Sequence, residues 1–273
     1  MNNTIKIQFD AIANEWDKNS GEKGLFHQRN DIDPKIIKVF GKISGKKILE
    51  IGCGNGYLSR LLANKGSIIT ATDISPKLIK LAKGKTNNNS KIKYLVQDAQ
   101  NMHDLKSNSF DMVLANMCVM DIPNIQLAFS EIKRVLKKKG VFIFSLNHPA
   151  FYNYGQSWTY SDIEGSKYFS RLVPKYLSNG EDKIIFKFDT EKKTEIVNIH
   201  RPIEYYLKIL FNNNFVVTNF LELNTIEKPQ KANKEDGEVV LRKSRFTSLE
   251  DKILKEKATK EIPMFLIIEA KLL

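Results

Sequence analysis

The nine residues Ile48-Leu49-Glu50-Ile51-Gly52-Cys53-Gly54-Asn55-Gly56 decide how this 273-residue chain folds. They form an apolar strand pattern that runs straight into a turn with glycine at every second position, and a helix pattern follows. Glycine is needed where a chain turns tightly and its backbone approaches a ligand, because a Cβ atom would collide there. We therefore expect this turn to hold a ligand, and the alternative is a simple structural turn.

Around this stretch, short apolar segments alternate with amphipathic ones, which indicates a sheet with helices on its faces. The patterns predict strands near residues 47–51, 67–72, 92–96, 109–115, 140–146, 215–222 and 263–271. They predict helices near residues 55–65, 76–84, 123–138 and 202–211. Because such crossovers are right-handed, we expect a Rossmann-like, doubly wound α/β fold with a seven-stranded, mostly parallel sheet.

The whole chain is expected to form one domain, with an insertion after the fifth strand. Its parts are a helical preface (1–40), a core (46–146), an aromatic-rich insertion (147–200), and a final helix and strands (201–273) with a charged loop at 224–262. The insertion lacks a steady period, so we interpret it as a lid or substrate insertion. A structural flap that packs its own aromatic residues is the alternative. The loop is expected to be mobile, with one short helix near residues 248–258.

Composition narrows the class of protein. No apolar run is long enough for a membrane span, and the first residues lack the apolar core of a signal peptide, so a cytoplasmic location is expected. Two cysteines, Cys53 and Cys118, are too few for a disulfide framework and are predicted to be free thiols. The formal charge of +12 suggests either a polyanionic partner such as RNA or background composition, because the lysines are spread along the chain. A monomer or a homodimer is expected.

The glycine spacing distinguishes two kinds of nucleotide site. A dinucleotide site would show G-x-G-x-x-G, whereas this chain has glycine at 52, 54 and 56 and Tyr57 after them. An acidic residue before a compact G-x-G-x-G turn resembles motif I of the class I S-adenosylmethionine-dependent methyltransferases. Asp73 at the end of the next strand, Gln97-Asp98-Ala99 after the third and Phe110-Asp111 in the fourth resemble the family's later motifs. The chain is most similar to the small-molecule branch, which is methyltransferase type 11-like.

This resemblance implies S-adenosyl-L-methionine as the cofactor and assigns residues to it. In the family, Asp73 would accept hydrogen bonds from the ribose hydroxyls, and Asp98 would face the adenine amino group. The implied cofactor residues are Glu50, Gly52, Cys53, Gly54, Asn55, Gly56, Asp73, Ile74, Asp98, Ala99, Asn116 and Met117. From the helical preface, Trp16 would cover the adenosyl group and Arg29 would pair with the cofactor carboxylate, although both are residue types that often serve packing or the surface.

Methyl transfer is an in-line displacement that requires alignment and exclusion of water, and it requires no metal. His148, in the Asn147-His148-Pro149 corner after the fifth strand, is the candidate general base, with a corner-capping role as its alternative. The candidate acceptor-binding residues are Phe151, Tyr152, Trp158, His200 and Arg201.

A small-molecule acceptor is the favoured interpretation, because the insertion is aromatic and no RNA-binding module is recognised. An RNA or protein methyltransferase is the second, supported by the net charge. The segment Asn116-Met117-Cys118-Val119 differs from the Asn-Pro-Pro-Tyr corner that amino-group methylators of nucleic acids often carry. A non-catalytic cofactor-binding protein is the third, because a fold does not guarantee activity.

Overall fold

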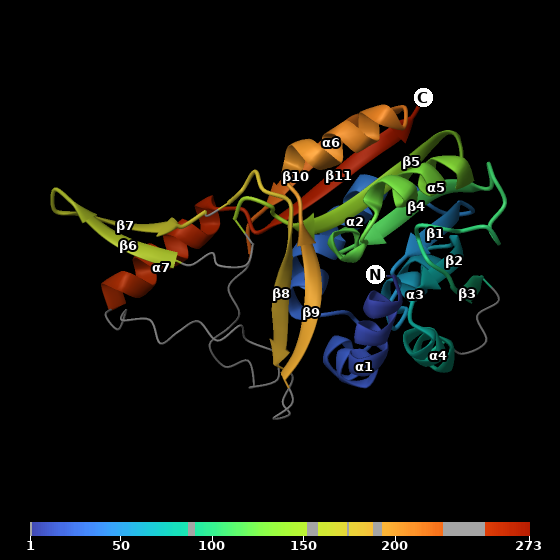
Figure 1. Ribbon diagram of the computed structural model, residues 1–273, viewed down its shortest axis with the longest axis horizontal. Helices are drawn as coiled ribbons and strands as arrows, with labels where there is room; N and C mark the ends of the chain where they lie inside the picture. The colour runs from blue at the N-terminus through green and yellow to red at the C-terminus, as the bar shows by residue number, and fades with distance from the viewer. Residues whose placement is uncertain (1, 87–90, 152–157, 174, 188–192, 226–248) are drawn as a thin grey trace.

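A seven-stranded sheet organises the computed structural model, which describes residues 2–86, 91–151, 158–173, 175–187, 193–225 and 249–273 (Figure 1). The order of its strands is β10-β11-β5-β4-β1-β2-β3. Strand β11 runs in the direction opposite to that of the other six strands. Their bounds are β1 Lys47–Ile51, β2 Ile68–Asp73, β3 Ile92–Val96, β4 Phe110–Asn116, β5 Leu136–Asn147, β10 Phe215–Leu223 and β11 Phe265–Leu272. The predicted Rossmann-like, mostly parallel sheet is confirmed.

Helices cover both faces of this sheet. They are α2 Asp33–Phe40, α3 Tyr57–Asn64, α4 Pro76–Gly84, α5 Ile125–Val135 and α6 Ile203–Asn212. Helix α1, Asn2–Ser20, lies against α4 and β9, and the chain also forms a π-helical turn at Gln28–Ile32 and a 3₁₀ turn, η2, at Val119–Asp121. Local sequence fixes where they begin. The Ser75 hydroxyl accepts a hydrogen bond from the Leu78 N–H at the start of α4, and the Asn124 side chain does the same for Leu127 at the start of α5.

Two apolar layers make up the core, one on each face of the sheet. Helices α2, α3 and α4 pack on one face through residues such as Ile36, Leu62 and Ile79. Helices α5 and α6 pack on the other face, where the Phe129 ring meets Phe142 and Phe144 at centroid distances of 5.0 and 5.6 Å. Because the central strands are buried on both faces, they read as nearly continuous apolar runs.

The boundary between α5 and β5 differs from the prediction, which carried the helix to residue 138. The helix ends at Val135, and Leu136 is already paired with Phe110 of β4. Lys139 then has a φ of 63°, and an added Cβ on Gly140 would lie 2.7 Å from the Lys137 carbonyl oxygen. Pairing with β4 and this tight bend therefore end the helix early.

The insertion contains two antiparallel hairpins that the sequence pattern did not predict. Hairpin β6 (Trp158–Ile163) and β7 (Ser166–Arg171) extends away from the main sheet beside α7 (Leu249–Glu261) (Figure 1). Hairpin β8 (Gly180–Lys187) and β9 (Lys193–His200) lies close to α1. Helix α7 is close to the predicted short helix, and the predicted mobile loop falls largely outside the described residues. None of the described helices is both long and apolar enough to cross a membrane.

Removing the ring of Phe144 should destabilise the fold strongly. Phe144 is fully buried and contacts the rings of Phe129, Phe142 and Tyr206. Phe144→Ala should lower the free energy of unfolding by about 3–5 kcal/mol, measured by urea titration. Phe211→Ala is the matched control, because that ring is 65% exposed on α6 and its loss should change stability by less than about 0.5 kcal/mol. Equal losses in the two variants would contradict this account of the core.

Candidate active site

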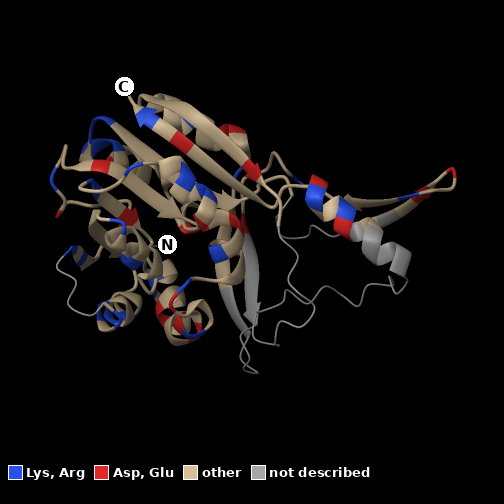
Figure 2. Ribbon diagram, turned by 180° about the vertical axis from the view of Figure 1, so that it is seen from behind, with Lys and Arg blue, Asp and Glu red and all other residues tan. Residues whose placement is uncertain are grey.

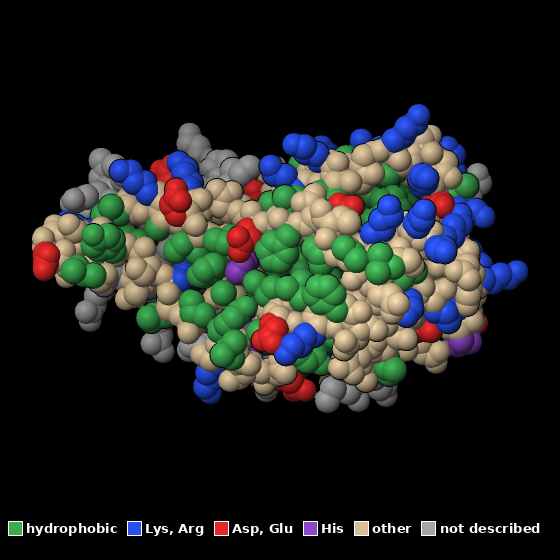
Figure 3. Space-filling model, turned by 90° about the horizontal axis from the view of Figure 1, so that it is seen from above, with side chains coloured by type: hydrophobic (Ala, Val, Ile, Leu, Met, Phe, Trp, Pro, Cys, Tyr) green, Lys and Arg blue, Asp and Glu red, His purple; other side chains and the backbone are tan. Residues whose placement is uncertain are grey.

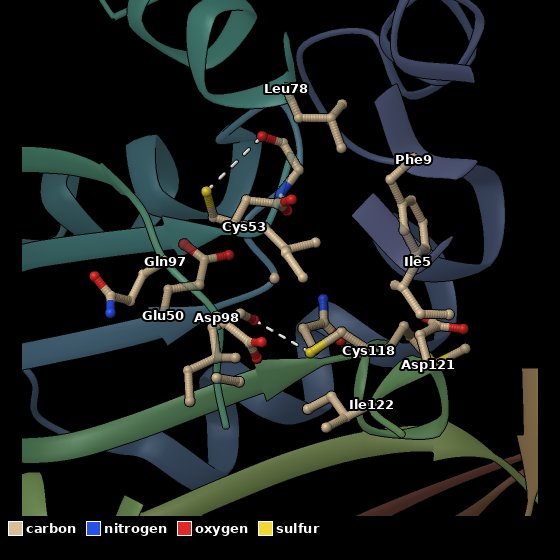
Figure 4. Close-up of a pocket in the computed structure, with 18 of the residues that line it drawn as sticks. Ile5, Phe9, Glu50, Cys53, Leu78, Gln97, Asp98, Cys118, Asp121 and Ile122 are labelled. Carbon is tan, nitrogen blue, oxygen red and sulfur yellow. Dashed lines mark hydrogen bonds between the residues drawn. The ribbon is translucent and has the colours of Figure 1, made fainter. Parts of the chain in front are cut away.

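A pocket lies at the carboxyl ends of the parallel strands, where open α/β sheets bind their ligands. Its volume is about 920 Å³, counted out to the solvent at its mouth. Residues that follow β1, β2, β3 and β4 form its floor, and Ile5, Phe9 and Trp16 of α1 form a wall. Figure 4 shows Ile5 and Phe9 across the pocket from Glu50 and Asp98.

The glycine turn after β1 brings its backbone against the pocket. Gly52 and Gly54 have φ angles of 65° and 54°, which few side chains tolerate. An added Cβ on Gly52 would lie 2.7 Å from the Cys118 Cβ, and one on Gly54 would lie 3.4 Å from the Trp16 ring nitrogen. The turn therefore needs glycine both for its conformation and for the space that the backbone leaves free.

Asp73 at the end of β2 holds this turn in place. One carboxylate oxygen accepts a hydrogen bond from the Gly54 N–H and the other from the Ser75 N–H, each at 2.9 Å. Burial raises the pKa of Asp73 to about 6, although both backbone donors oppose the rise. Each oxygen has a further lone pair, so the carboxylate can also accept hydrogen bonds from a ligand in the pocket.

Glu50 and Asp33 place two more acidic groups in and beneath the pocket. Glu50, at the pocket, accepts a hydrogen bond from the Ser59 hydroxyl, and burial raises its pKa to about 8. Asp33, beneath the pocket, accepts hydrogen bonds from the Tyr57 hydroxyl and the Asn116 amide, and burial raises its pKa to about 7. Both shifts favour the neutral carboxyl group unless a positive charge lies nearby.

Most of the predicted cofactor residues meet around this one pocket. Those that line it are Trp16, Glu50, Gly52, Cys53, Gly54, Asn55, Asp73, Ile74, Asp98, Ala99, Asn116 and Met117. Asp98 is held by Gln100, whose backbone and side-chain N–H groups donate to one carboxylate oxygen at 2.8 and 2.9 Å. Their binding of a cofactor stays a prediction, and their convergence supports it.

Two predicted cofactor residues lie elsewhere. Gly56 has a φ of 75° at the start of α3, where an added Cβ would lie 2.5 Å from the Tyr94 hydroxyl oxygen, so it serves helix packing. Arg29 is exposed and does not line the pocket. Its guanidinium donates to the Gly24 carbonyl at 3.0 Å and lies over the Phe26 ring. The structure thus gives Arg29 a local role in the preface instead of a place at the pocket.

His148 is buried and also lies outside the residues that line the pocket. Its Nε2 is 2.9 Å from a Glu222 carboxylate oxygen, and its Nδ1 accepts a hydrogen bond from the Ala150 N–H at 3.2 Å. The ring also stacks on Phe151 at a centroid distance of 4.8 Å. Burial lowers the pKa of His148, although Glu222 opposes this. With both nitrogens engaged, the geometry favours the corner-capping alternative.

Of the predicted acceptor-binding residues whose side chains the structure describes, Phe151, His200 and Arg201, none lines the pocket. His200 hydrogen-bonds the Tyr176 carbonyl at 2.8 Å, while Arg201 donates to the carbonyls of Ile122 and Pro123, each at 2.8 Å. Arg201 therefore supports the pocket from behind, because Ile122 and Pro123 line it. Trp158 is on the hairpin that extends away, and its side chain, like Tyr152, lies outside the described residues.

The pocket also contains residues that the sequence analysis missed. They are Ile5, Phe9, Gln28, Ile51, Tyr57, Leu78, Gln97, Gln100, Cys118, Asp121, Ile122 and Pro123. Position after a strand was an available signal for Gln97 and Asp121, since both follow the strand ends that face the site. No local signal in the sequence shows which ligand an apolar stripe such as that of α1 covers.

The charge of the pocket tests which ligand fits. Four carboxyl groups line it, those of Glu50, Asp73, Asp98 and Asp121, and neither Lys nor Arg is among its described lining residues. A pyrophosphate would find no basic side chain among these residues, whereas a cationic ligand would favour the ionised, negatively charged forms of the carboxyl groups. S-adenosylmethionine fits, because it carries a sulfonium and an amino group, and it would supply a methyl group already activated by that sulfonium.

Comparisons with known proteins agree with this interpretation. Residues 49–144 match the family model of the methyltransferase domain. A ubiquinone biosynthesis O-methyltransferase of Xanthomonas oryzae pv. oryzae (strain PXO99A) is 28% identical over 180 residues, which are 65% of this chain and 72% of that protein.

Two solved structures share the fold. An S-adenosylmethionine-dependent methyltransferase from Mesorhizobium loti superposes with a TM-score of 0.62 at 20% identity, over 87% of this chain and 96% of that one. A putative S-adenosylmethionine-dependent methyltransferase from Listeria monocytogenes has a TM-score of 0.62 at 21% identity, over 88% and 97%. The domain match and the fold identify a class I S-adenosylmethionine-dependent methyltransferase, as the sequence predicts.

Gly54→Val and Asp73→Ala should each weaken S-adenosylmethionine binding by about 100-fold or more while the protein stays folded. Valine would fill the space beside Trp16, and alanine would remove the carboxylate that holds the turn and accepts from the ligand. Isothermal titration calorimetry measures both affinities.

Gly45→Ala and Asp104→Asn are the matched controls for this test. Gly45 has a φ of 77° with nothing within 4 Å of an added Cβ, and Asp104 is 64% exposed. Both controls should bind normally. Wild-type affinity in Gly54→Val and Asp73→Ala would refute this placement of the cofactor.

Proposed function

We propose that this enzyme transfers the methyl group of S-adenosylmethionine to a small-molecule acceptor. The observation that carries the proposal is the walled pocket, in which α1 and the segment Asp121–Pro123 stand over the strand ends. Apolar side chains such as Ile5, Phe9 and Ile122 line its acceptor side. A pocket of this kind suits an acceptor with an apolar body and excludes water from the displacement.

The acceptor atom that we propose is oxygen. The curated relatives described above are ubiquinone biosynthesis O-methyltransferases, and they cover 65% of this chain. An uncharged hydroxyl must lose its proton as it attacks, so a carboxylate near the acceptor side would assist. The pocket contains such a group, Asp121.

Among the described residues of the inserted segment, those of its second hairpin contribute to the wall in the proposed arrangement. Ile196 of β9 is buried against Ile12 of α1, and Phe9 and Trp16 pack on the same cluster. Asn198 of β9 donates to Asp121 at 3.2 Å. We therefore propose one domain, residues 1–273, in which β9 braces the pocket.

The placement of the lysines disfavours the RNA alternative. Lys and Arg are scattered over several elements (Figure 2), and on the face in Figure 3 they gather toward one end, with hydrophobic side chains in the middle. Exposed lysines such as Lys46, Lys138 and Lys139 stand at the amino ends of parallel strands. The pocket opens at the carboxyl ends, so this positive charge does not surround its mouth.

An activity screen tests the proposed function. The purified protein with labelled S-adenosylmethionine should methylate a member of a panel of small hydroxyl, amine and thiol compounds, and total RNA and protein from cells should remain unlabelled. Labelling of RNA or protein alone would support the second interpretation. Binding of the cofactor without transfer to any class would support a non-catalytic protein.

His148→Ala should lower the melting temperature without lowering turnover of the folded enzyme. The substitution removes two partly buried hydrogen bonds of a buried side chain, at a cost of about 1–3 kcal/mol, and leaves the pocket lining unchanged. Thermal unfolding and the pH-rate profile are measured on one preparation. A drop of about 10²- to 10⁴-fold in turnover with a flattened acidic limb would restore His148 as the general base.

A cytoplasmic location and a monomeric or homodimeric state complete the proposal. The location is supported by the two cysteines, Cys53 and Cys118. Both line the same pocket, and they form no disulfide there. Unpaired thiols are typical of a reducing compartment.

A further inference from the structure

One carboxyl group of the pocket has no assigned role in cofactor binding. Asp121 ends the η2 turn that follows β4, and it lines the pocket while remaining half-exposed. Its Oδ1 accepts a hydrogen bond from the Asn198 Nδ2 at 3.2 Å. Its Oδ2 accepts none from any residue in the described part of the chain, so it is available to a molecule in the pocket.

The sheet order separates Asp121 from the carboxylates predicted to hold the cofactor. Asp73 and Asp98 follow β2 and β3, which lie on one side of β1, whereas Asp121 follows β4 on the other side. Around Asp121 the pocket is lined by Ile122 and Pro123, and Figure 4 shows Ile5 beside it. This half of the pocket therefore offers an apolar surface with one carboxylate, which suits an acceptor with an apolar body and one donor group.

The position of Asp121 is fixed from behind by the end of the β8–β9 hairpin. Asn198 holds one carboxylate oxygen, and Arg201 binds the backbone carbonyls of the next two residues, Ile122 and Pro123, at 2.8 Å each. Arg201 is buried, with 4% of its surface exposed. A carboxylate held in this way needs little reorganisation to meet a reacting group.

We propose that Asp121 is the catalytic base that receives the proton of a hydroxyl acceptor, a proposal that rests on the proposed function. The acceptor oxygen forms a bond to the methyl carbon as the carbon–sulfur bond breaks. The electron pair of that bond stays on sulfur, and the hydroxyl proton passes to Oδ2 of Asp121. Asn198 is then a positioning residue, since it touches the base and not the acceptor.

The charged and titratable groups around Asp121 set the pH at which it can act. Burial raises the pKa of Asp121 to about 8, the Asn198 hydrogen bond and the Arg201 charge oppose this, and the Asp73 charge adds to it. Cys118 and Tyr206 also interact with it, and burial raises the pKa of both. A base must be ionised to accept a proton, so turnover should rise with pH and level off above about 8.

Asp121→Asn tests the proposal with the hydroxyl compound of the screening panel that wild type methylates fastest. Turnover should fall by about 10²- to 10⁴-fold and the rise with pH should disappear, while calorimetry should give an affinity for S-adenosylmethionine within about threefold of wild type. Asp104→Asn, an exposed carboxylate outside the pocket, should leave all three quantities unchanged. In Asp121→Ala, added formate should restore part of the lost rate, which a purely structural role would not allow.

Asn198→Ala supplies a second, independent readout. Its hydrogen bond lowers the pKa of Asp121, so its loss should move the rise in turnover to higher pH and preserve most of the plateau rate. Wild-type turnover and pH dependence in Asp121→Asn would overturn the proposal. So would a wild type that methylates amines and no hydroxyl compound. Failure of wild type on every small molecule would instead overturn the proposed function.

Discussion

The hydrogen bond between the Gly54 N–H and the Asp73 carboxylate is the contact on which the site depends. It joins the turn after β1 to the end of the neighbouring strand β2 at 2.9 Å. The turn can make this contact because Gly52 and Gly54 adopt positive φ angles, which place N–H groups where side chains would otherwise stand. One carboxylate thus shapes the turn and keeps lone pairs free at the pocket, so the residue predicted to bind the cofactor also holds the fold of the turn.

A buried polar network extends this arrangement beneath the pocket. The Asn116 amide donates to Asp33 and to the Tyr57 hydroxyl, and its oxygen accepts from the Ser145 hydroxyl at 2.6 Å. Ser145 in turn accepts from the backbone N–H of Met117, which has a φ of 56° at the pocket. Such a backbone conformation costs about 1–2 kcal/mol for a residue with a side chain, and the network offsets that cost. The end of β4 is therefore held in a strained form at the pocket.

The sequence was sufficient to predict the central sheet, because strands buried on both faces leave apolar runs that periodicity detects. It was also sufficient to predict that Gly52, Gly54, Asp73 and Asp98 meet around one pocket, since their positions at or after strand ends place them at one edge of the sheet. It failed for the hairpins of the insertion, whose strands are short and lie outside the main sheet. It also failed for Ile5 and Phe9, because only the tertiary fold brings α1 over the strand ends. Asp121 was missed as well, although its position after β4 was an available signal.

The place of β11 in the sheet has a consequence for how the protein is made. This strand, Phe265–Leu272, lies between β10 and β5 and pairs with both. During synthesis, β5 and β10 emerge from the ribosome with no strand between them, and each exposes an unpaired edge. The sheet closes only after residue 272 has left the exit tunnel. Between the emergence of residue 223 and that of residue 272 the nascent chain therefore carries two open edges, and chaperones that cover such edges would act on it during that interval.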